Sequence, residues 1–486
     1  MEQEITKSGF EIAISTLNGW VWGPPMLGLL LLTGLYLTLG LRFMSIIRVP
    51  YAFGELFRKR EGRSEGDVSP FSALMTALSS TIGTGNIAGV AAAIAIGGPG
   101  AVFWMWMTAI LGTATKYSEG VLAIKFREVD ADGRHVGGPM YYIKNGLGKK
   151  WLWLAFTFAI FGILASWGTG ASIQANSVAD ALNSSYGVDP LITATFLAVA
   201  AGAVILGGIK RIATVASKLV PAMALSYLVA GIIVISMNIE NIPAAFGAIF
   251  RGAFGLHSAG TGVAVGLIML AMQKGVARGI FSNEAGQGSA PIAHAAAKNN
   301  DPVNQGIVAM LGTVIDTLIV CTITALIILT SNIIPLECFP TAENAATFLS
   351  GTQPAGCDTG APLTIAAFNA SLSFADFELG KHIVTIGLFI FGFTTILGWS
   401  YYGERCAEFL FGEKSILPFR ISWIVVVFAG AAVLSFEDKV GNIVNLFWLV
   451  ADTLTGLMAA PNLIALCLLS PLVFKLTKEY FAREKK

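Results

Sequence analysis

The chain has 486 residues, of which 55% are hydrophobic and only 13% are charged, and its mean hydropathy is +0.70. Because a soluble globular domain carries about a quarter charged residues, this composition excludes an ordinary soluble protein and indicates many membrane-buried helices. The net charge of +1 gives no bulk field that would attract nucleic acid or an acidic partner.

Apolar stretches of about 20 residues can cross the hydrocarbon core as helices, because each residue rises about 1.5 Å. The sequence contains eleven such stretches, and no long hydrophilic segment forms a separate domain. We therefore predict an all-α polytopic membrane protein with a single transporter domain over residues 1–486. The predicted spans are 24–44, 70–96, 99–124, 151–182, 189–208, 215–238, 261–297, 304–331, 382–411, 418–436 and 441–473.

The basic residues indicate the orientation of these spans. Loops rich in Lys and Arg remain in the cytoplasm. With the N-terminus outside, most of the 31 Lys and Arg residues fall on the cytoplasmic side, and only Lys7, Arg251, Lys381 and Lys439 fall outside. We expect a multi-pass protein of the plasma membrane, in a prokaryote the inner membrane, with a cytoplasmic tail at 476–486.

The second span, 70–96, is interrupted by polar and glycine residues between Thr81 and Asn86. Glycine weakens a helix and polar side chains are costly in hydrocarbon, so we predict unwound backbone that lines a cavity. The alternative is close helix packing through Gly85 and Gly89, which have the spacing of a small-xxx-small pattern.

The seventh span, 261–297, has a longer polar and glycine-rich interruption from Gln273 to Ser289. Since it lies five spans after the first interruption, the two broken helices run in opposite directions. This arrangement predicts two five-helix repeats of inverted topology with a binding site between them. The predicted repeats are 70–240 and 241–475, preceded by an extra helix and a cytoplasmic loop in 1–69.

The long loop 332–381 is expected outside the cell and contains Cys338 and Cys357. An oxidising compartment permits a disulfide there. We favour two unpaired cysteines, with the disulfide as the alternative. The apolar segment 361–372 of this loop could fold over the outer mouth.

Seven motifs follow one another along the chain, namely Gly83–Gly89, Gly97–Ala114, Lys116–Gly120, Gly137–Tyr142, Gln174–Ser177, Phe281–Gly288 and Thr394–Trp399. With these motifs in this order, the chain resembles the sodium:alanine symporters, the alanine or glycine:cation symporter family. The resemblance implies a leucine-transporter-like fold with 11 helices and sodium-coupled uptake of alanine or glycine.

An amino acid zwitterion needs a partner for each end. Half-helix N-termini can hold a carboxylate, so we expect the backbone from Gly83 to Gly85 to do so, with Thr84 and Asn86 nearby. The resemblance implies that Gln174 reaches the substrate, and an interhelical hydrogen bond is its alternative role.

The ammonium end needs acceptors, which unwound carbonyls around Ile280, Phe281 and Ser282 and the Thr395 hydroxyl can supply. Trp399 is one helical turn beyond Thr395, with Ile396 between them, so its indole is expected to limit the size of the substrate. The alternative for Trp399 is an interfacial, lipid-facing position.

Sodium binds to several hard oxygens, which carbonyls and hydroxyls provide without a fixed charge. Similarity to the fold implies one sodium site between the second and ninth spans, and a second site containing a carboxylate remains open. The expected ligands of the first site are Thr81, Ile82, Thr394 and Thr395.

Acidic residues within the spans are candidates for function, because charge is costly there. We expect Glu119 to pair with Lys116, Asp316 with Thr317 to face the cavity, and Asp180 and Asp452 to lie near helix ends in water. Glu284 is assigned to a gate with Lys274 or Arg278, which belong to the same span.

The four histidines, His135, His257, His294 and His382, are scattered and show no metal or catalytic cluster, and a surface position is expected for His294. We therefore predict no enzyme and no cofactor. A passive channel and proton coupling are the alternatives to a sodium symporter. The sequence leaves open alanine or glycine preference, L or D selectivity, stoichiometry and oligomeric state.

Overall fold

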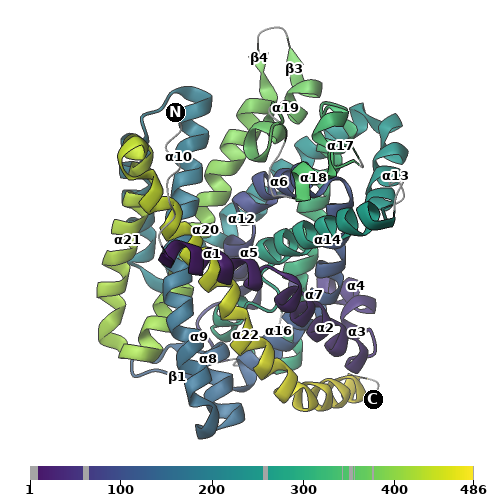
Figure 1. Ribbon diagram of the computed structural model, residues 1–486. Coiled ribbons are helices and arrows are strands. Elements are labelled where there is room, and N and C mark those ends of the chain that lie inside the picture. The colour runs from purple at the N-terminus through teal and green to yellow at the C-terminus, as the bar shows by residue number, and fades with distance from the viewer. Residues whose placement is uncertain are drawn as a thin grey trace.

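Figure 1 shows the computed structural model, an all-helical molecule with long helices packed side by side and two short β-hairpins. The structure describes residues 9–58, 65–255, 261–341, 343–349, 354, 356–374 and 377–484. Lys7 and His257 lie outside the described residues.

The first half of the chain forms α1 (Gly9–Val21), α2 (Pro24–Gly40), α3 (Met44–Ile47), α4 (Val49–Phe57), α5 (Pro70–Thr81), α6 (Ala88–Gly97), α7 (Gly100–Lys125), α8 (Pro139–Tyr142), α9 (Leu152–Ala165), α10 (Ile173–Tyr186), α11 (Pro190–Ile205) and α12 (Gly208–Met237). Shorter turns are η1 (Thr84–Asn86), η2 (Ile143–Leu147), η3 (Lys149–Trp151), η4 (Ser166–Ser172) and η5 (Ile239–Asn241). The antiparallel strands β1 (Glu128–Val129) and β2 (His135–Val136) follow α7.

The second half forms α13 (Ile242–Ala253), α14 (Thr261–Asn283), α15 (Ala290–Ala295), α16 (Pro302–Thr313), α17 (Thr322–Thr330), α18 (Ala345–Leu349), α19 (Gly360–Leu372), α20 (Leu379–Phe411), α21 (Ile416–Ala432) and α22 (Glu437–Glu484). Its shorter turns are η6 (Val314–Cys321), η7 (Leu336–Cys338), η8 (Glu413–Ser415) and η9 (Val433–Phe436). The antiparallel strands β3 (Ser373–Phe374) and β4 (Phe377–Glu378) precede α20.

Three of the long helices begin with the same local signal, a capping side chain followed by proline. Ser69 accepts from the Ser72 amide at the start of α5, Asp189 from the Leu191 amide at α11, and Asp301 from the Val303 amide at α16. The side chain satisfies an amide that has no partner inside the helix, and proline tolerates the first helical position. These starts lie within two residues of the predicted spans.

Eight helical segments in the described part of the chain are long and apolar enough to cross a membrane. The other predicted spans correspond to the pair α5–α6, to α7, and to α11, which is 16 residues long. The first span is longer than predicted, because α1 precedes α2 and extends the helical segment to Gly9–Gly40. The protein is therefore a multi-pass membrane protein built from helices.

The predicted break in the second span is confirmed. Helix α5 ends at Thr81 and α6 begins at Ala88, with only the short turn η1 between them. Gly83 is in an extended conformation, with φ −138° and ψ −157°.

The break in the seventh span lies further along the chain than predicted. Residues 273–283 belong to the continuous helix α14, and only 284–289 are non-helical before α15. The expectation of unwound backbone at 280–282 is therefore wrong. The turn occurs at Glu284, Gly286 and Gly288, where φ is +55°, +88° and +83° and the helix cannot continue.

The earlier glycines of this span have a packing role instead. A Cβ on Gly275 would lie 2.2 Å from the Ala101 carbonyl oxygen, and one on Gly279 would lie 2.2 Å from the Thr108 hydroxyl. Both neighbours belong to α7, so these glycines allow α14 and α7 to approach closely without breaking the helix.

The long loop covers part of the molecule and is closed by a disulfide. Cys338 and Cys357 are bonded, so the favoured unpaired state is wrong and the alternative is confirmed. Helix α19 packs against α6 and α20, and Thr364 Oγ1 donates to the Ile87 carbonyl at 3.4 Å. The apolar segment of the loop therefore lies over the first break.

An ion-pair network fixes the end of α20 near the β1–β2 hairpin. Arg405 is 2% exposed and pairs with Glu404 at 2.5 Å, with Glu408, and with Asp130 at 3.8 Å. Arg420 reaches Glu404 from α21 at 2.6 Å. Since a buried charge is costly without partners, these contacts hold the ends of α20 and α21 together.

Candidate functional site

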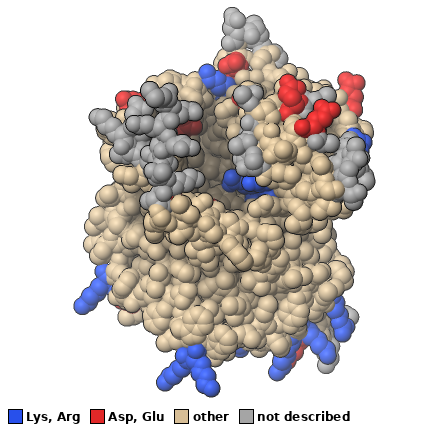
Figure 2. Space-filling model, viewed as in Figure 1, with Lys and Arg blue, Asp and Glu red and all other residues tan. Residues whose placement is uncertain are grey.

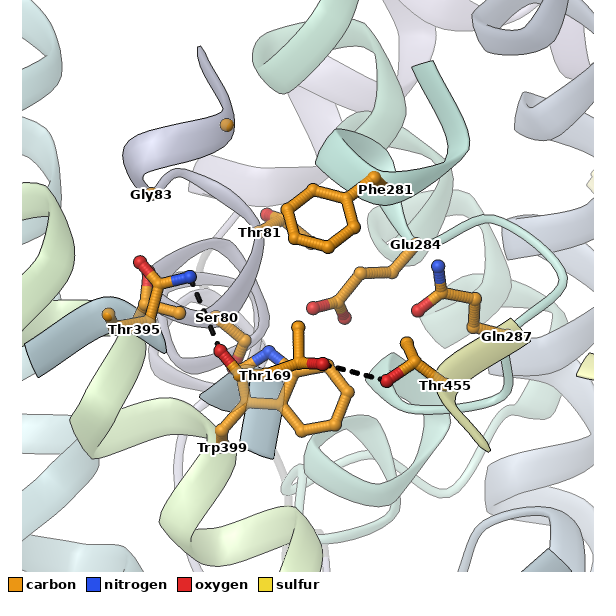
Figure 3. Close-up of a pocket in the computed structure, with 12 residues that line it drawn as sticks. Ser80, Thr81, Gly83, Thr169, Phe281, Glu284, Gln287, Thr395, Trp399 and Thr455 are labelled. Atoms are coloured by element: carbon orange, nitrogen blue, oxygen red, sulfur yellow. Dashed lines mark hydrogen bonds between the residues drawn. The ribbon is translucent and has the colours of Figure 1, made fainter. Parts of the chain in front are cut away.

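A small cavity of about 20 Å³ lies in the interior where the two broken helices meet. This volume holds about one water molecule, so the space between the two breaks is nearly closed in this conformation. Figure 3 shows the side chains that surround it. The lining residues are Ser80, Thr81, Gly83, Gly85, Thr169, Gln174, Phe281, Glu284, Gln287, Thr395, Trp399 and Thr455.

Gly83 forms one wall of the cavity. Its N–H donates to Asn86 Oδ1 at 2.8 Å, which holds the turn between α5 and α6. A Cβ at this position would lie 2.6 Å from Thr395 Oγ1, so no side chain fits. The turn η1 begins at Thr84, and the first N–H groups of a helical segment have no partner within it.

Gln174 lines the cavity from α10 and also bonds across helices. Thr84 Oγ1 donates to Gln174 Oε1 at 3.1 Å, and Gln174 Nε2 donates to the Thr169 carbonyl at 3.4 Å. The two roles weighed for Gln174 therefore coexist in its position: the side chain borders the cavity and ties α10 to the first break.

One of the expected ion ligands, Thr395, joins α20 to the end of α5. Thr395 Oγ1 lies 3.4 Å from the Ile82 carbonyl oxygen and 2.9 Å from that of Phe391, and Thr394 Oγ1 lies 3.0 Å from the latter. Thr81 lines the cavity, but its hydroxyl lies 3.3 Å from two carbonyl oxygens of its own helix. The Thr394 hydroxyl also lies 3.6 Å from Met223 Sδ of α12, whereas the Thr395 hydroxyl reaches the first break.

The opposite wall differs in part from the prediction. Phe281 lines the cavity, whereas the Ile280 carbonyl accepts the Glu284 amide at 2.8 Å within the last turn of α14. Ser282 turns away from the cavity and bonds to Asp316. Predicted substrate residues that do not line the cavity are Thr84, Asn86, Ile280, Ser282 and Ile396.

Trp399 lines the cavity and is only 3% exposed, so its lipid-facing alternative is wrong. A Cβ on Gly170 would lie 2.5 Å from the Trp399 Cβ, because η4 approaches α20 closely here. The indole is held from behind by this contact and by an edge contact with Tyr402.

Asp316 connects the two broken helices from behind the cavity. Its Oδ1 accepts from Asn86 Nδ2 at 2.7 Å, and its Oδ2 accepts from Ser282 Oγ at 2.8 Å and from Thr317 Oγ1 at 2.7 Å. Asn86 also donates to Ser282 Oγ at 3.0 Å. Asp316 is therefore central to the site, although it does not line the cavity as expected.

Glu284 is the main cavity residue that the sequence reasoning assigned elsewhere. Figure 3 shows its carboxylate pointing into the cavity between Phe281 and Gln287. Neither Lys274 nor Arg278 forms an ion pair with it within 4.0 Å among the described residues, so the predicted gate pair is wrong. The sequence feature that could have placed Glu284 in the cavity is its position just before Gly286 and Gly288, which unwind the helix.

Four further lining residues were not predicted, namely Ser80, Thr169, Gln287 and Thr455. The hydroxyls of Thr169 and Thr455 are 2.9 Å apart and join η4 to α22 (Figure 3). Gln287 Nε2 donates to the Ile280 carbonyl at 3.2 Å. Of these four residues, only Gln287 belongs to one of the family motifs, Phe281–Gly288.

The remaining buried polar groups correct several expectations. Glu119 accepts from Asn462 Nδ2 at 2.7 Å and has no ion pair with Lys116 within 4.0 Å in the described chain. Asp452 lies inside α22 and accepts from Asn18 Nδ2 at 2.9 Å, whereas Asp180 is exposed as expected. His294 is 1% exposed and 2.8 Å from Gln305, so the expected surface position is wrong.

Phe281 also lines a second cavity, which contains three charged side chains, Lys274, Arg278 and Asp452, together with Asn18, Trp22 and Ala277. The Arg278 guanidinium is 5.7 Å from the centre of the Phe281 ring. Figure 2 shows a hollow on this face in which basic side chains lie. The phenyl ring therefore stands between a charged vestibule and the inner cavity.

The sequence pattern of the sodium:alanine symporter family matches residues 7–486. The chain belongs to this family. Among its relatives, the sodium/alanine symporter AgcS of Methanococcus maripaludis is 50% identical over 97% of each chain. The Bacillus subtilis protein named "Probable sodium/glutamine symporter GlnT" is 36% identical over 98% of this chain and 91% of its own length.

Solved structures share the fold of this sodium:alanine symporter family member. MhsT in complex with L-phenylalanine has a TM-score of 0.52 at 13% identity, covering 86% of this chain and 99% of MhsT. A manganese transporter of Eremococcus coleocola has a TM-score of 0.51 at 10% identity, covering 82% of this chain and 79% of that transporter. The fold is therefore leucine-transporter-like.

As a member of the sodium:alanine symporter family, the protein is a membrane transporter and not an enzyme.

Proposed function

We propose that this protein carries alanine or glycine across the membrane together with sodium, by alternating access. One observation supports this most: α5–α6 and α14–α15 both break at a single small cavity. Irregular backbone inside a membrane is tolerated where it lines a cavity, and broken helices of transporters bind substrate and ion there. The name of the relative AgcS agrees with this substrate and this ion.

The substrate carboxylate binds at the first break, on the backbone from Gly83 to Gly85, with Thr84 and Asn86 holding the turn. Gln174 and Thr395 border the same space. Trp399 closes the opposite side and limits the side chain to hydrogen or methyl. The ammonium group faces the end of α14, where Ile280, Phe281 and Ser282 form the last turn before the second break, and the buried Ile396 follows Thr395 in α20.

Sodium binds between α5 and α20, at Thr81, Ile82, Thr394 and Thr395. The Thr395 hydroxyl, 3.4 Å from the Ile82 carbonyl oxygen, supports this position. The Asp316 cluster, which touches both breaks, is the carboxylate-containing second site that the sequence left open. Coupling follows if the cation orders the first break, so that the carboxylate site forms only when the ion is present.

We also propose the membrane arrangement given by the sequence: 11 spans, inverted repeats at 70–240 and 241–475, and a cytoplasmic tail at 476–486. Two observations support the orientation. Lys and Arg side chains gather at the end of the molecule where α22 finishes (Figures 1 and 2). The disulfide lies in the loop with α18 and α19 at the opposite end, which suits an oxidising outside.

The experiment that tests this function is uptake of labelled alanine and glycine by proteoliposomes, with sodium and pH gradients imposed separately. Concentrative uptake driven by sodium alone is expected. Uptake driven only by the pH gradient would replace sodium with protons as the coupling ion. Equilibration without accumulation under either gradient would contradict symport and favour a channel.

A further inference from the structure

Glu284 is the one charged side chain among the described residues that line the inner cavity. It is 2% exposed, and its carboxylate points toward the centre of the space rather than into the protein (Figure 3). An ionisable group at such a place is costly and calls for a partner.

The backbone at Glu284 is held in a conformation that a non-glycine residue rarely adopts. Its φ is +55°, and the other two residues of this turn with positive φ, Gly286 and Gly288, are glycines. Two hydrogen bonds fix it: the Glu284 amide donates to the Ile280 carbonyl at 2.8 Å, and its carbonyl accepts the Gln287 amide at 3.1 Å. Strain of this kind persists where the surroundings enforce it, and it is concentrated at binding sites.

The protein neighbours of the Glu284 carboxylate occupy only some of its hydrogen-bond acceptor positions. Ser289 Oγ donates to Oε2 at 2.5 Å, and the Trp399 side chain is a second hydrogen-bonding neighbour. Lys116 interacts with Glu284 electrostatically, but no ion pair within 4.0 Å forms in the described part of the chain. A carboxylate offers about four acceptor positions. The hydrogen bond from Ser289 therefore uses only part of the acceptor capacity of the Glu284 carboxylate.

The polarity of the surrounding helices matches a zwitterion. The first break leads into α6, whose N-terminus carries partial positive charge. Glu284 follows the last turn of α14, where carbonyl groups carry partial negative charge. Gly83 and Gly85 of the first break and Glu284 of the second thus line the same cavity.

We propose that Glu284 binds the ammonium group of the transported amino acid through a charge-assisted hydrogen bond. The assignment rests on the proposed function and names the group that recognises the amine. It makes the site selective for α-amino acids over carboxylates of the same size that lack the amine, since an anion without the ammonium would face the Glu284 carboxylate unshielded.

The test is equilibrium binding of labelled alanine to the purified protein in sodium, with competition by unlabelled alanine and by lactate. The wild type is compared with Glu284→Gln, which keeps an acceptor for Ser289 and removes the charge. Glu119→Gln is the matched control, because it removes a buried carboxylate that does not line the cavity but bonds to Asn462 and to the backbone of Gly286 and Gly288, so it reports the effect of disturbing the second break alone.

Glu284→Gln is expected to lower alanine affinity at least about tenfold, as for the loss of a charge-assisted hydrogen bond, while lactate binding stays equal or tightens. Glu119→Gln is expected to keep the wild-type preference for alanine over lactate. An unchanged alanine-to-lactate ratio in Glu284→Gln would overturn the assignment. A wild type that binds neither alanine nor glycine would instead overturn the proposed function.

Should Glu284→Gln give no folded protein, Glu284→Asp replaces it, since it keeps the charge on a side chain one methylene shorter. We expect it to bind alanine several-fold more weakly while preferring alanine to lactate. Alanine affinity equal to that of the wild type would then count against the assignment, because the carboxylate would have been withdrawn without effect.

Discussion

Replacing Gly83 by alanine tests the contact between the first break and α20. The added methyl group would lie 2.6 Å from Thr395 Oγ1, a separation at which one of the two groups must move. Thr395 also bonds to the Phe391 carbonyl at 2.9 Å and lies 3.4 Å from the Ile82 carbonyl. Its displacement would therefore disturb the oxygens proposed to bind sodium.

The expected size of this effect follows from the packing. Inserting a methyl group into a well-packed interior costs about 1–3 kcal/mol. Where that cost falls on the ion-bound state, it corresponds to about a 5- to 150-fold change in a binding constant, since 1.4 kcal/mol is tenfold. We expect the sodium concentration for half-maximal alanine uptake to rise at least about fivefold in Gly83→Ala.

Gly89→Ala is the matched control in the same broken span. An added Cβ there would meet only the Arg278 Cδ, at 4.0 Å, which is ordinary van der Waals contact. Sodium dependence of uptake in proteoliposomes is measured for both variants at a fixed alanine concentration. Wild-type sodium dependence in Gly83→Ala, in protein that is folded and active, would refute the reasoning.

Three further predictions use other parts of the structure. Trp399→Ala is expected to admit larger neutral amino acids, because the indole closes the cavity; competition of alanine uptake by leucine measures this, and an unchanged substrate range would remove Trp399 from the size filter. Asp316→Asn is expected to destabilise the protein by about 1–3 kcal/mol, since a buried donor would face other donors; thermal unfolding checks this, and a wild-type Tm would argue against the cluster. Cys338→Ser with Cys357→Ser is expected to lower the Tm while preserving alanine uptake, because the disulfide closes a loop outside the cavity; loss of uptake in folded protein would show that the loop takes part in transport.

The first break was predictable because its signals agree. Between Thr81 and Asn86 the sequence combines glycine with polar side chains, and neither packs well as a helix in lipid. The resulting position of the cavity, and of Gly83, Gln174 and Trp399 around it, followed from this break and from the family resemblance.

The second break was placed too early because two kinds of glycine look the same in a sequence. Gly275 and Gly279 lie in a continuous helix and make room for α7, whereas Gly286 and Gly288 adopt positive φ and unwind the chain. Only the partner helix distinguishes packing from unwinding. For the same reason Glu284 was assigned to a gate rather than to the cavity.

Partners distant in sequence were the other source of error. Glu119 bonds to Asn462 of α22 rather than pairing with Lys116 one turn away, and Asp452 bonds to Asn18 of the N-terminal segment. Local spacing predicts neighbours on one helix, but tertiary packing brings closer ones from elsewhere. The Cys338–Cys357 disulfide was likewise not predictable from sequence spacing, because only the folded loop brings the two cysteines together.

The most direct test of cation-dependent substrate binding is the affinity of the purified protein for labelled alanine in sodium and in choline at equal ionic strength. Joint binding predicts that alanine binds at least about tenfold more tightly in sodium, a coupling free energy near 1.4 kcal/mol and within the range usual for linked sites. Equal affinity in the two salts would contradict the claim that the cation orders the first break for the substrate.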